Sequence, residues 1–406
     1  MTGREHDVVL LGATGFVGRL VARHLALHAP AGTRVALAGR SADRLAEVRD
    51  ALPSRAHTWP LVLADSHDDA TLADLAASAR VVVSTVGPYA RHGLPLVAAC
   101  ARAGTHYADL TGETPFVREA ADRHDAVARS TGARLVHACG YDSVPSDLGV
   151  LVLHRSASSD GAGPLRDVRL LARARGGVSG GTVESALGIV EHAARSAAVR
   201  RLLADPYALS PDRAAEPSTP QPPDVQPVRV LPGGRWAAPF PMASFNSRVV
   251  RRSNALQGWA YGRELRYAEA MGVGRGLRGA VAVVGITAGL GVGVAALALP
   301  PTRALVRRAL PAGSGPSEAT RESGWFRMDL VGVTADGRHY RAEVAGPGDP
   351  GYAATGVMLG EAALALALDE DRLPDRAGSL TPAAGLGDVL VDRLRAAGHT
   401  YAAAAR

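Results

Sequence analysis

The chain has 406 residues, of which 47 % are hydrophobic, and a formal net charge of +6. Every residue in its Lys+Arg total of 45 is an arginine, which excludes a Walker lysine, a Schiff-base lysine and a Tyr/Lys catalytic pair. The arginines are scattered rather than clustered with aromatic residues, so we expect no nucleic-acid partner. Cys100 and Cys139 have neither metal-binding nor disulfide spacing, so we predict no metal site and a reducing, cytoplasmic setting.

The first predicted element is a buried strand at Val8–Leu11 that runs into three spaced glycines and then into an amphipathic helix. Gly12 allows a sharp turn off the strand, Gly15 lets a pyrophosphate approach the backbone, and Gly18 lets the helix lie close to the sheet. The free N–H groups and positive dipole end of that helix favour an anionic dinucleotide. The residues predicted to bind it here are Gly12, Ala13, Thr14, Gly15, Phe16, Val17 and Gly18.

Short apolar strands alternate with helical segments after this turn. Ser41–Ala51 is predicted as a helix with Ser41 as its N-cap, and Leu94–Ala103 as a helix that ends at Gly104. This alternation is typical of a doubly wound parallel sheet, the Rossmann fold, which we assign to residues 1–155. Ligands of that fold bind at the carboxyl ends of the strands. The further strands predicted are Thr33–Ala38, Trp59–Leu63, Val81–Val86, His106–Leu110 and Arg134–His137.

Three of these strand ends carry residues that we expect to contact the nucleotide. Arg40 and Ser41 follow the second strand, where an NAD enzyme carries an acid for the ribose 2′-hydroxyl. A guanidinium there can hold a 2′-phosphate, so NADP is the predicted cofactor. Asp65 follows the third strand, and Tyr89, after the fourth, packs on the nicotinamide or covers the loop. The residues predicted after the fourth strand are Val86, Gly87, Pro88 and Tyr89.

A dense polar cluster, Gly140–Asp147, follows the sixth strand. Tyr141 or Asp142 could supply a proton and orient the substrate there, which makes them the candidate catalytic residues. Asp142, Ser143 and Asp147 could instead be turn and N-cap residues for a helix that enters at Leu148. A second glycine turn, Gly180–Ser185, leads into a helix whose N–H groups could receive an anion or a carbonyl, or could be an ordinary helix start.

Residues 156–350 are predicted to form a second, α+β domain. Arg166–Ala174 alternates like a strand, and Thr182–Leu203 has the pattern of one long helix. The proline-rich stretch 205–232 is expected to be a long loop or a lid. Residues 351–406 begin with a helix that we expect to pack back on the first domain. The remaining predicted elements are two strands, Trp325–Thr334 and Arg338–Ala345, joined by an Asp-Gly hairpin turn, and the helix Tyr352–Asp369.

Residues 279–301 contain no charged side chain and are long enough to cross a bilayer. They are rich in alanine and glycine, so their hydrophobicity is modest. Three interpretations stay open: a helix on an anionic membrane surface, a buried core or dimer helix, and a true span. We favour the membrane surface, which would be the inner face of the plasma membrane. The arginines that flank the segment are Arg275, Arg278, Arg303, Arg307 and Arg308.

Together these motifs resemble the saccharopine dehydrogenase-like oxidoreductases, whose actinobacterial branch includes the trans-acting enoyl reductases of lipid assembly. The resemblance covers nearly the whole chain and implies NADP-dependent reduction in lipid or polyketide-derived chain building. The matching stretches are Gly12–Gly18, Ala38–Arg40, Val86–Tyr89, Tyr107–Glu113, Gly140–Asp147, Gly348–Tyr352, Thr381–Ala383 and Arg393–Gly398.

We therefore expect an NADP(H)-dependent enoyl reductase for an unsaturated lipid or polyketide acyl thioester, free or carrier-bound, in glycolipid biosynthesis. Tyr141 or N–H groups near Gly181 would stabilise charge on the thioester oxygen, and Tyr141 or water would protonate the α-carbon. One alternative is a saccharopine-type amino- or imino-acid dehydrogenase, which needs arginines such as Arg91, Arg173 and Arg175 to converge on carboxylates. The other is a non-catalytic NADPH-binding protein of lipid surfaces. A homodimer is compatible with all three.

Overall fold

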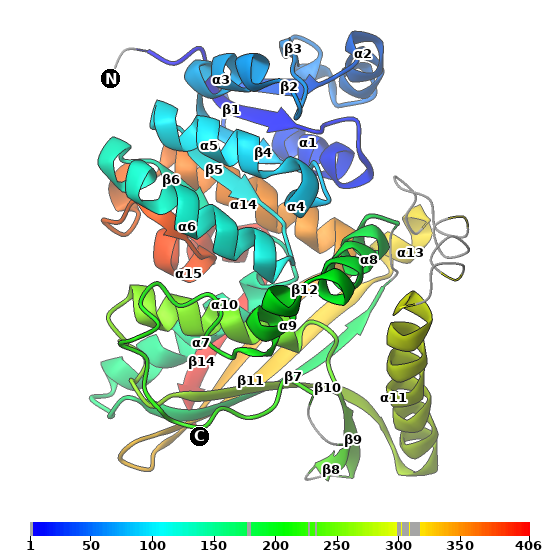
Figure 1. The fold of residues 1–406 in the computed structure, drawn as a ribbon, viewed down its shortest axis with the longest axis vertical. Helices are drawn as coiled ribbons and strands as arrows, with labels where there is room; N and C mark the ends of the chain where they lie inside the picture. The colour runs from blue at the N-terminus through cyan, green and yellow to red at the C-terminus, as the bar shows by residue number, and fades with distance from the viewer. Residues whose placement is uncertain are drawn as a thin grey trace.

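The computed structural model describes residues 3–176, 180–225, 228–231, 234–298, 302, 308 and 317–406. Two seven-stranded sheets organise these residues. We call the sheet in the upper half of Figure 1 sheet A and the one in the lower half sheet B. The part of the chain that carries sheet A begins at the N-terminus, as predicted.

Sheet A has the strand order β13-β6-β5-β4-β1-β2-β3, and every neighbouring pair in it is parallel. The predicted Rossmann sheet is therefore confirmed. Its edge strand β13 comes from the C-terminal part of the chain and was not predicted. The strands are β1 (His6–Leu11), β2 (Val35–Gly39), β3 (Leu61–Leu63), β4 (Ala79–Ser84), β5 (His106–Asp109), β6 (Arg134–Val136) and β13 (Gly378–Leu380).

Helices cover both faces of sheet A, which explains why its central strands read as continuous apolar runs. In β1, Val8 and Leu10 belong to the core on one face, while Val9 and Leu11 belong to the core on the other. Helix α1 packs on the first face, and α3 and α5 on the second. The helices of this part of the chain are α1 (Phe16–His28), α2 (Ala42–Asp50), α3 (Asp69–Ser78), α4 (Tyr89–His92), α5 (Leu94–Ala103) and α6 (Thr114–Thr131).

Helix α14 (Thr355–Leu368) returns from the C-terminal part of the chain and packs against α1 and β4. This confirms the predicted return to the first domain. Residues Pro350–Leu368 are apolar enough to cross a membrane, with a mean hydropathy of 1.4, but 78 % of this stretch is buried inside the protein. We therefore assign α14 as a core helix.

Sheet B is mixed, with the order β14-β12-β11-β7-β10-β9-β8, and only β7 and β10 pair in parallel. The predicted Asp-Gly hairpin joins β11 to β12, with Gly337 at a φ of +84°. The strand β14 at the end of the chain was not predicted. The strands are β7 (Leu165–Arg175), β8 (Arg229–Leu231), β9 (Arg235–Ala238), β10 (Arg266–Arg275), β11 (Trp325–Thr334), β12 (His339–Pro347) and β14 (Thr400–Ala405).

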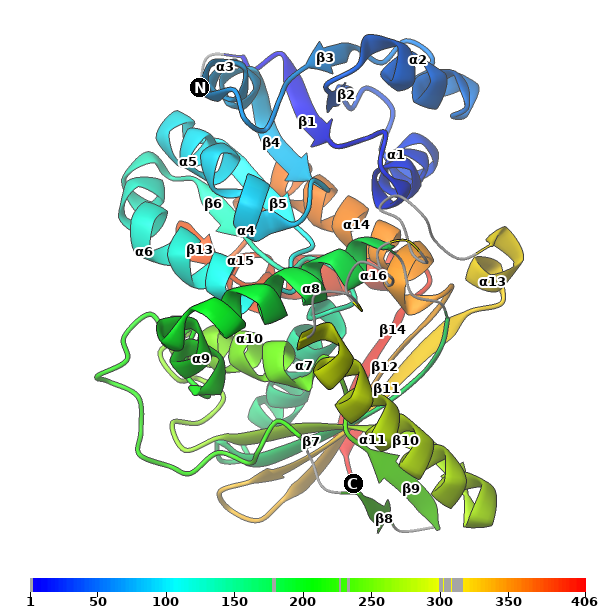
Figure 2. The same ribbon diagram turned by 45° about the vertical axis from the view of Figure 1, so that its right-hand side comes forward.

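Further helices complete the structure: α8 crosses the middle of the molecule in Figure 2, and α11 and α13 lie at its side in Figure 1. The prediction of one helix over Thr182–Leu203 is wrong, because the chain is extended at Ser196, whose side chain caps the next helix at Val199. Helix α7 runs across residue 155, where we predicted the first domain to end. The helices are α7 (Val144–Ser159), α8 (Gly180–Arg195), α9 (Ala197–Ala204), α10 (Ala243–Leu256), α11 (Gly276–Ala298), α13 (Glu318–Glu322), α15 (Pro382–Gly385) and α16 (Gly387–Ala396).

The proline-rich stretch has neither helix nor strand over residues 205–225, but β8 occupies residues 229–231 of it. Residues 226, 227 and 232 lie outside the described residues. The described part is anchored to α10, because Asp224 accepts a hydrogen bond from Ser247 at 2.9 Å and pairs with Arg248 at 2.7 Å. Of the apolar stretch 279–301, α11 contains residues 279–298, and residues 299–301 lie outside the described residues.

Candidate functional site

The turn after β1 has the geometry that its glycines predict. Gly12 has a φ of +89°, in the left-handed region that favours glycine. A Cβ at Gly18 would lie 2.2 Å from the carbonyl oxygen of Gly12, so only glycine allows α1 to approach the turn this closely. The hydroxyl of Thr85 donates to that same oxygen at 3.0 Å and ties the end of β4 to the turn.

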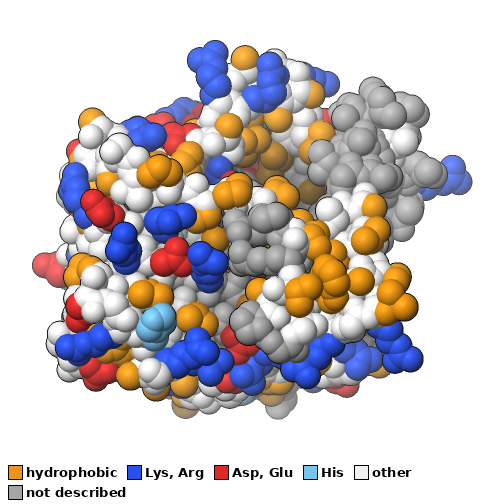
Figure 3. Space-filling model, turned by 90° about the horizontal axis from the view of Figure 1, so that it is seen from below, with side chains coloured by type: hydrophobic (Ala, Val, Ile, Leu, Met, Phe, Trp, Pro, Cys, Tyr) orange, Lys and Arg blue, Asp and Glu red, His pale blue; other side chains and the backbone are white. Residues whose placement is uncertain are grey.

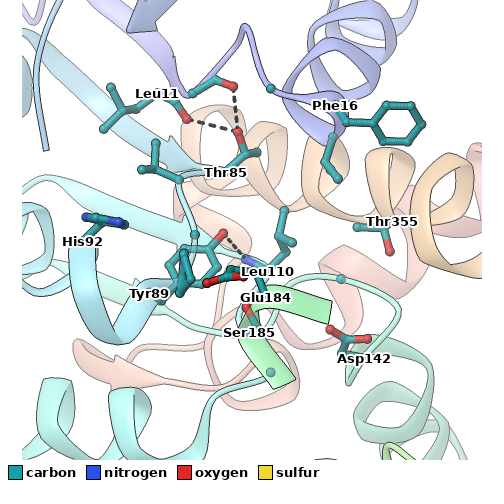
Figure 4. A pocket seen from close by; sticks show the side chains of 18 of the residues that line it. Leu11, Phe16, Thr85, Tyr89, His92, Leu110, Asp142, Glu184, Ser185 and Thr355 are labelled. Carbon is teal, nitrogen blue, oxygen red and sulfur yellow. Dashed lines mark hydrogen bonds between the residues drawn. The ribbon is translucent and has the colours of Figure 1, made fainter. Parts of the chain in front are cut away.

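A cavity of about 790 Å³ opens at the carboxyl ends of the strands of sheet A. Sheet A forms one side of it, and α8 and the start of α10 form another (Figure 4). This volume lies within the range of about 300–1,000 Å³ that is usual for small-molecule sites. Eleven predicted site residues line it: Gly12, Thr14, Gly15, Phe16, Val17, Arg40, Val86, Gly87, Pro88, Tyr89 and Asp142.

Five predicted site residues do not line the cavity. Gly18 packs α1 against the turn, and Ala13 is buried in the core behind it. Ser41 is the N-cap of α2, where its hydroxyl accepts from the N–H of Arg44 at 3.4 Å. Asp65 bonds to the backbone N–H of His67 at 3.0 Å and to its ring Nδ1 at 3.1 Å. These two bonds, together with the charges of His67 and Arg40, lower the pKa of Asp65. The fifth residue is Tyr141.

Arginine and histidine side chains gather at the cavity end next to β2 and β3. Arg40 and Arg44 both line the cavity and are exposed. His67 and His92 line it as well, with 3.1 Å between Nε2 of His67 and Nδ1 of His92. Two guanidiniums in this position fit the 2′-phosphate of NADP, which carries a double negative charge.

Tyr89 links the loops that follow β4 and β5. Its hydroxyl donates to the carbonyl oxygen of Ser84 at 2.9 Å and accepts from the N–H of Leu110 at 3.4 Å. The ring is buried against Phe116, with 5.6 Å between the ring centroids. The hydroxyl of Tyr89 is thus hydrogen-bonded within the protein, although the residue also lines the cavity (Figure 4).

The two candidate catalytic residues differ in their surroundings. Asp142 lies in the cavity wall, facing the space between α8 and the glycine turn, and burial raises its pKa to about 6. Tyr141 points away into the core, where its ring packs edge-on against Phe326 with 5.3 Å between the centroids. Its buried hydroxyl has no hydrogen-bond partner among the described residues, and burial raises its pKa.

The interpretation of this cluster as turn and N-cap residues is correct for the position of Ser143, although not for its side chain, and it is wrong for Asp147. Helix α7 begins at Val144, before the predicted entry at Leu148, and Ser143 makes no side-chain cap; its hydroxyl donates to Asn246 at 3.4 Å instead. Asp147 lies inside α7 and accepts from Ser253 and from the N–H of Ala383 at 2.8 Å. Its role is to join α7, α10 and α15 beneath the site.

The arginines that an imino-acid substrate would require do not converge on the cavity. Arg91 pairs with Glu184 at 3.7 Å and with Glu191 at 3.5 Å. Arg173 pairs with Asp329 in sheet B. Neither these two nor Arg175 lines the cavity. The second glycine turn begins α8 at Gly180, and residues 184 and 185 of that helix belong to the cavity wall.

Several lining residues were not predicted from the sequence. Arg44 could have been found, because it lies in the first turn of α2, directly after the predicted site residues Arg40 and Ser41. The apolar wall could not, because it combines α8 with the start of α10, far apart in the sequence. The unpredicted lining residues include Arg44, His67, His92, Leu110, Ile189, Met242, Phe245 and Thr355.

Comparisons with known proteins agree with this geometry. A family model described as the saccharopine dehydrogenase NADP-binding domain matches residues 8–136. A Mycobacterium tuberculosis protein, named provisionally as a trans-acting enoyl reductase, is 53 % identical over 411 residues, covering 98 % of this chain and 97 % of its own. The trans-acting enoyl reductase of Mycobacterium bovis is 48 % identical over 407 residues and 97 % of each chain.

Apo saccharopine dehydrogenase (L-Glu forming) from Saccharomyces cerevisiae aligns over 100 % of both chains, with a TM-score of 0.55 at 14 % identity. At this low identity the likeness shows a shared fold. The sequence relatives, in contrast, cover almost the whole chain at about half identity. The chain therefore belongs to the trans-acting enoyl reductase family, and it is an NADP-dependent oxidoreductase built on the saccharopine dehydrogenase fold.

Proposed function

We propose that this protein reduces the α,β double bond of an unsaturated acyl thioester with NADPH. The observation that carries the proposal is a single cavity with three kinds of wall. A glycine turn and two arginines suit a phosphorylated dinucleotide, Asp142 offers a proton, and an apolar wall suits a hydrocarbon chain. The enoyl reductase names of the relatives support the same reaction.

The residues of the turn are placed to hold the cofactor. Gly15 leaves open the space that a Cβ would take beside the cavity, so a pyrophosphate can reach the N–H groups at the start of α1. Arg40 and Arg44 would hold the 2′-phosphate, and the residues of the Gly87–Tyr89 turn would contact the nicotinamide. Bound NADPH supplies a hydride to the substrate.

Asp142 is the group that we assign as proton donor to the α-carbon. A carboxyl with its pKa at about 6 keeps a useful protonated fraction near neutral pH and transfers its proton readily. Tyr141 packs in the core away from the cavity, so we assign it a structural role. Leu110, Ile189 and Met242 line the apolar wall and would contact the acyl chain.

A reductase that acts in trans receives its substrate from another protein, so we propose a carrier-bound thioester of a lipid or polyketide chain, used in glycolipid assembly. The test is NADPH oxidation by the purified protein with a long-chain trans-2-enoyl thioester, with an imino acid, and without substrate. We expect oxidation with the thioester alone. Oxidation with the imino acid alone would overturn the proposal, and NADPH binding without any turnover would favour the non-catalytic alternative.

Two variants test the proton donor. Asp142→Asn keeps the side-chain volume and should lower turnover at least about a hundredfold, the usual contribution of general acid catalysis, while NADPH affinity stays the same. Tyr141→Phe keeps the ring packed against Phe326 and should lose far less. If Tyr141→Phe loses as much turnover as Asp142→Asn, the assignment of the proton donor to Asp142 is wrong.

We further propose that α11 contacts an anionic membrane surface on the cytoplasmic side. Leu277, Val281 and Val284 are spaced along one helical face and are 82 %, 66 % and 67 % exposed. Figure 3 shows hydrophobic side chains gathered over the start of α11, with basic side chains beside them. Replacing all three apolar residues by serine should abolish flotation with phosphatidylglycerol vesicles without reducing NADPH binding. Unchanged flotation would contradict the proposal.

A further inference from the structure

Glu113 is a buried carboxylate behind the cavity wall. It is 2 % exposed and stands directly before α6, but its side chain does not cap that helix. Its oxygens accept instead from the start of α4, from the N–H of Tyr89 at 3.0 Å and the N–H of Ala90 at 2.9 Å. Glu113 therefore holds the turn that contains Gly87 and Pro88, which line the cavity.

The same carboxylate also holds α8. The hydroxyl of Ser185 donates to Oε1 of Glu113 at 2.9 Å. Ser185 and Tyr89 both line the cavity and lie near each other in Figure 4. One side chain thus connects a loop of sheet A, which faces the cofactor site, to a helix that forms the wall assigned to the acyl chain.

Burial and ion pairing also hold α8 in the described structure. Among its described side chains, only Leu187 is buried in the core. The ion pairs of α8 with Arg91 are 3.7 and 3.5 Å long, and the Arg91 side chain is 50 % exposed, so they contribute little. A hydrogen bond from a hydroxyl to a shielded carboxylate is stronger than such a pair. The Ser185–Glu113 bond is therefore a stronger attachment of α8 than its ion pairs with Arg91.

We propose that Glu113 is a positioning residue for hydride transfer, an inference that rests on the proposed function. Its carboxylate holds the Gly87–Tyr89 turn and α8 in one arrangement, so that the cofactor wall and the acyl wall are assembled together. Glu113 does not contact the substrate. Loss of this link shifts one wall relative to the other and slows the reaction more than it weakens NADPH binding.

The experiment combines hydrogen exchange with kinetics on Ser185→Ala, Ser185→Thr, Glu113→Gln and the wild type. Ser185→Ala should raise amide exchange in α8 about tenfold and lower kcat about tenfold, with the NADPH Kd changed less than about threefold. Ser185→Thr keeps a hydroxyl and should restore both values. Glu113→Gln should also speed exchange at Tyr89 and Ala90. Ser78→Ala is the matched control, because that hydroxyl bonds within α3 to Leu75 at 2.9 Å.

Unchanged exchange in Ser185→Ala, or an equal loss of kcat in Ser185→Ala and Ser185→Thr, would overturn the inference. The exchange measurement needs only the protein and NADPH. If the wild type turns over no enoyl thioester, the proposed function is wrong. Amide exchange in α8 still shows in that case whether Glu113 holds the two walls together. If Glu113→Gln does not fold, the two Ser185 variants still give the answer.

Discussion

Alanine substitutions at Gly15 and Gly18, in the β1–α1 turn, should have different effects: one on NADPH binding and the other on stability. A Cβ at Gly18 would lie 2.2 Å from the carbonyl oxygen of Gly12 and 2.9 Å from the Cα of Ala13. Both neighbours are backbone, so α1 must move away from the turn. A Cβ at Gly15 meets only the Gly12 oxygen, at 3.2 Å, and the φ of −73° at Gly15 suits alanine. On its other sides this Cβ would face the cavity.

These distances set the expected magnitudes. Overpacking against backbone costs at the upper end of the usual range, so Gly18→Ala should destabilise the protein by about 3 kcal/mol. For a chain of this length that corresponds to a fall in Tm of about 3–4 °C. For Gly15→Ala, the slight crowding and the entropy gained by removing a glycine nearly cancel, so stability should change by less than about 1 kcal/mol. Losing one charge-assisted hydrogen bond to the pyrophosphate should weaken NADPH binding at least about tenfold.

The assay is thermal unfolding together with calorimetric titration of NADPH. Gly188→Ala is the matched control, because nothing lies within 4 Å of a Cβ there and Gly188 does not line the cavity. It should keep the wild-type Tm or raise it, with unchanged affinity. If Gly15→Ala binds NADPH as tightly as the wild type, the pyrophosphate does not lie against this turn, and the placement of the cofactor is refuted.

Three further predictions concern charge. Arg40→Asp should weaken NADPH binding far more than NADH binding, and an equal loss for both in calorimetry would reject this residue as a 2′-phosphate ligand. Because Asp142 has its pKa raised to about 6 and must be protonated to act, kcat/KM should fall as the pH rises through that value, and a flat profile would count against it. Burial raises the pKa of Asp147 and of Glu269 to about 7, so the folded protein holds protons that the unfolded chain has released. The wild type should therefore lose stability relative to Glu269→Gln as the pH rises from about 4.5 to about 7, and a Tm difference between the two proteins that stays constant over this range would contradict the shift.

The sequence determines the cofactor half of the site well because its signals are local. The strand, the turn and the first helix are contiguous, and the steric reasons for Gly12 and Gly18 are both found in the structure. Arg40 is found in the same way, from its distance along the chain after the turn. Local patterns also predict the hairpin at Gly337, since Asp-Gly favours the φ of +84° found there.

The catalytic half was harder to predict because it depends on contacts between distant segments. Tyr141 and Asp142 are neighbours in the sequence, and only the fold decides which one faces the cavity. Thr355 contributes to that choice, because its hydroxyl accepts from the N–H of Tyr141 at 3.1 Å across more than two hundred residues. The helix break at Ser196 also depends on tertiary contacts, because serine occurs both inside helices and at their N-caps.

The edge strands β13 and β14 were missed for a different reason. Gly378–Leu380 is only three residues long, and Thr400–Ala405 consists mostly of alanine, which has low strand propensity. Both become strands because a sheet edge offers them backbone hydrogen bonds. Their positions have a consequence for the site: β13 extends sheet A, β14 extends sheet B, and α14, which precedes both strands in the sequence, packs on α1. The C-terminal part of the chain thus joins the cofactor-binding sheet to the sheet that supports the acyl wall.

The proposed cofactor site and the proposed acyl wall belong to different parts of the fold. The residues after β1, β2 and β4 that we propose for the nucleotide follow strands of a sheet that is buried on both faces and tolerates little change. Ile189, Met242 and Phe245 lie on α8 and α10, outside that sheet. Changes in their size should alter which acyl chain fits without moving the glycine turn. Substrate choice can therefore vary among relatives while the NADP site stays the same, with Glu113 keeping the two halves aligned.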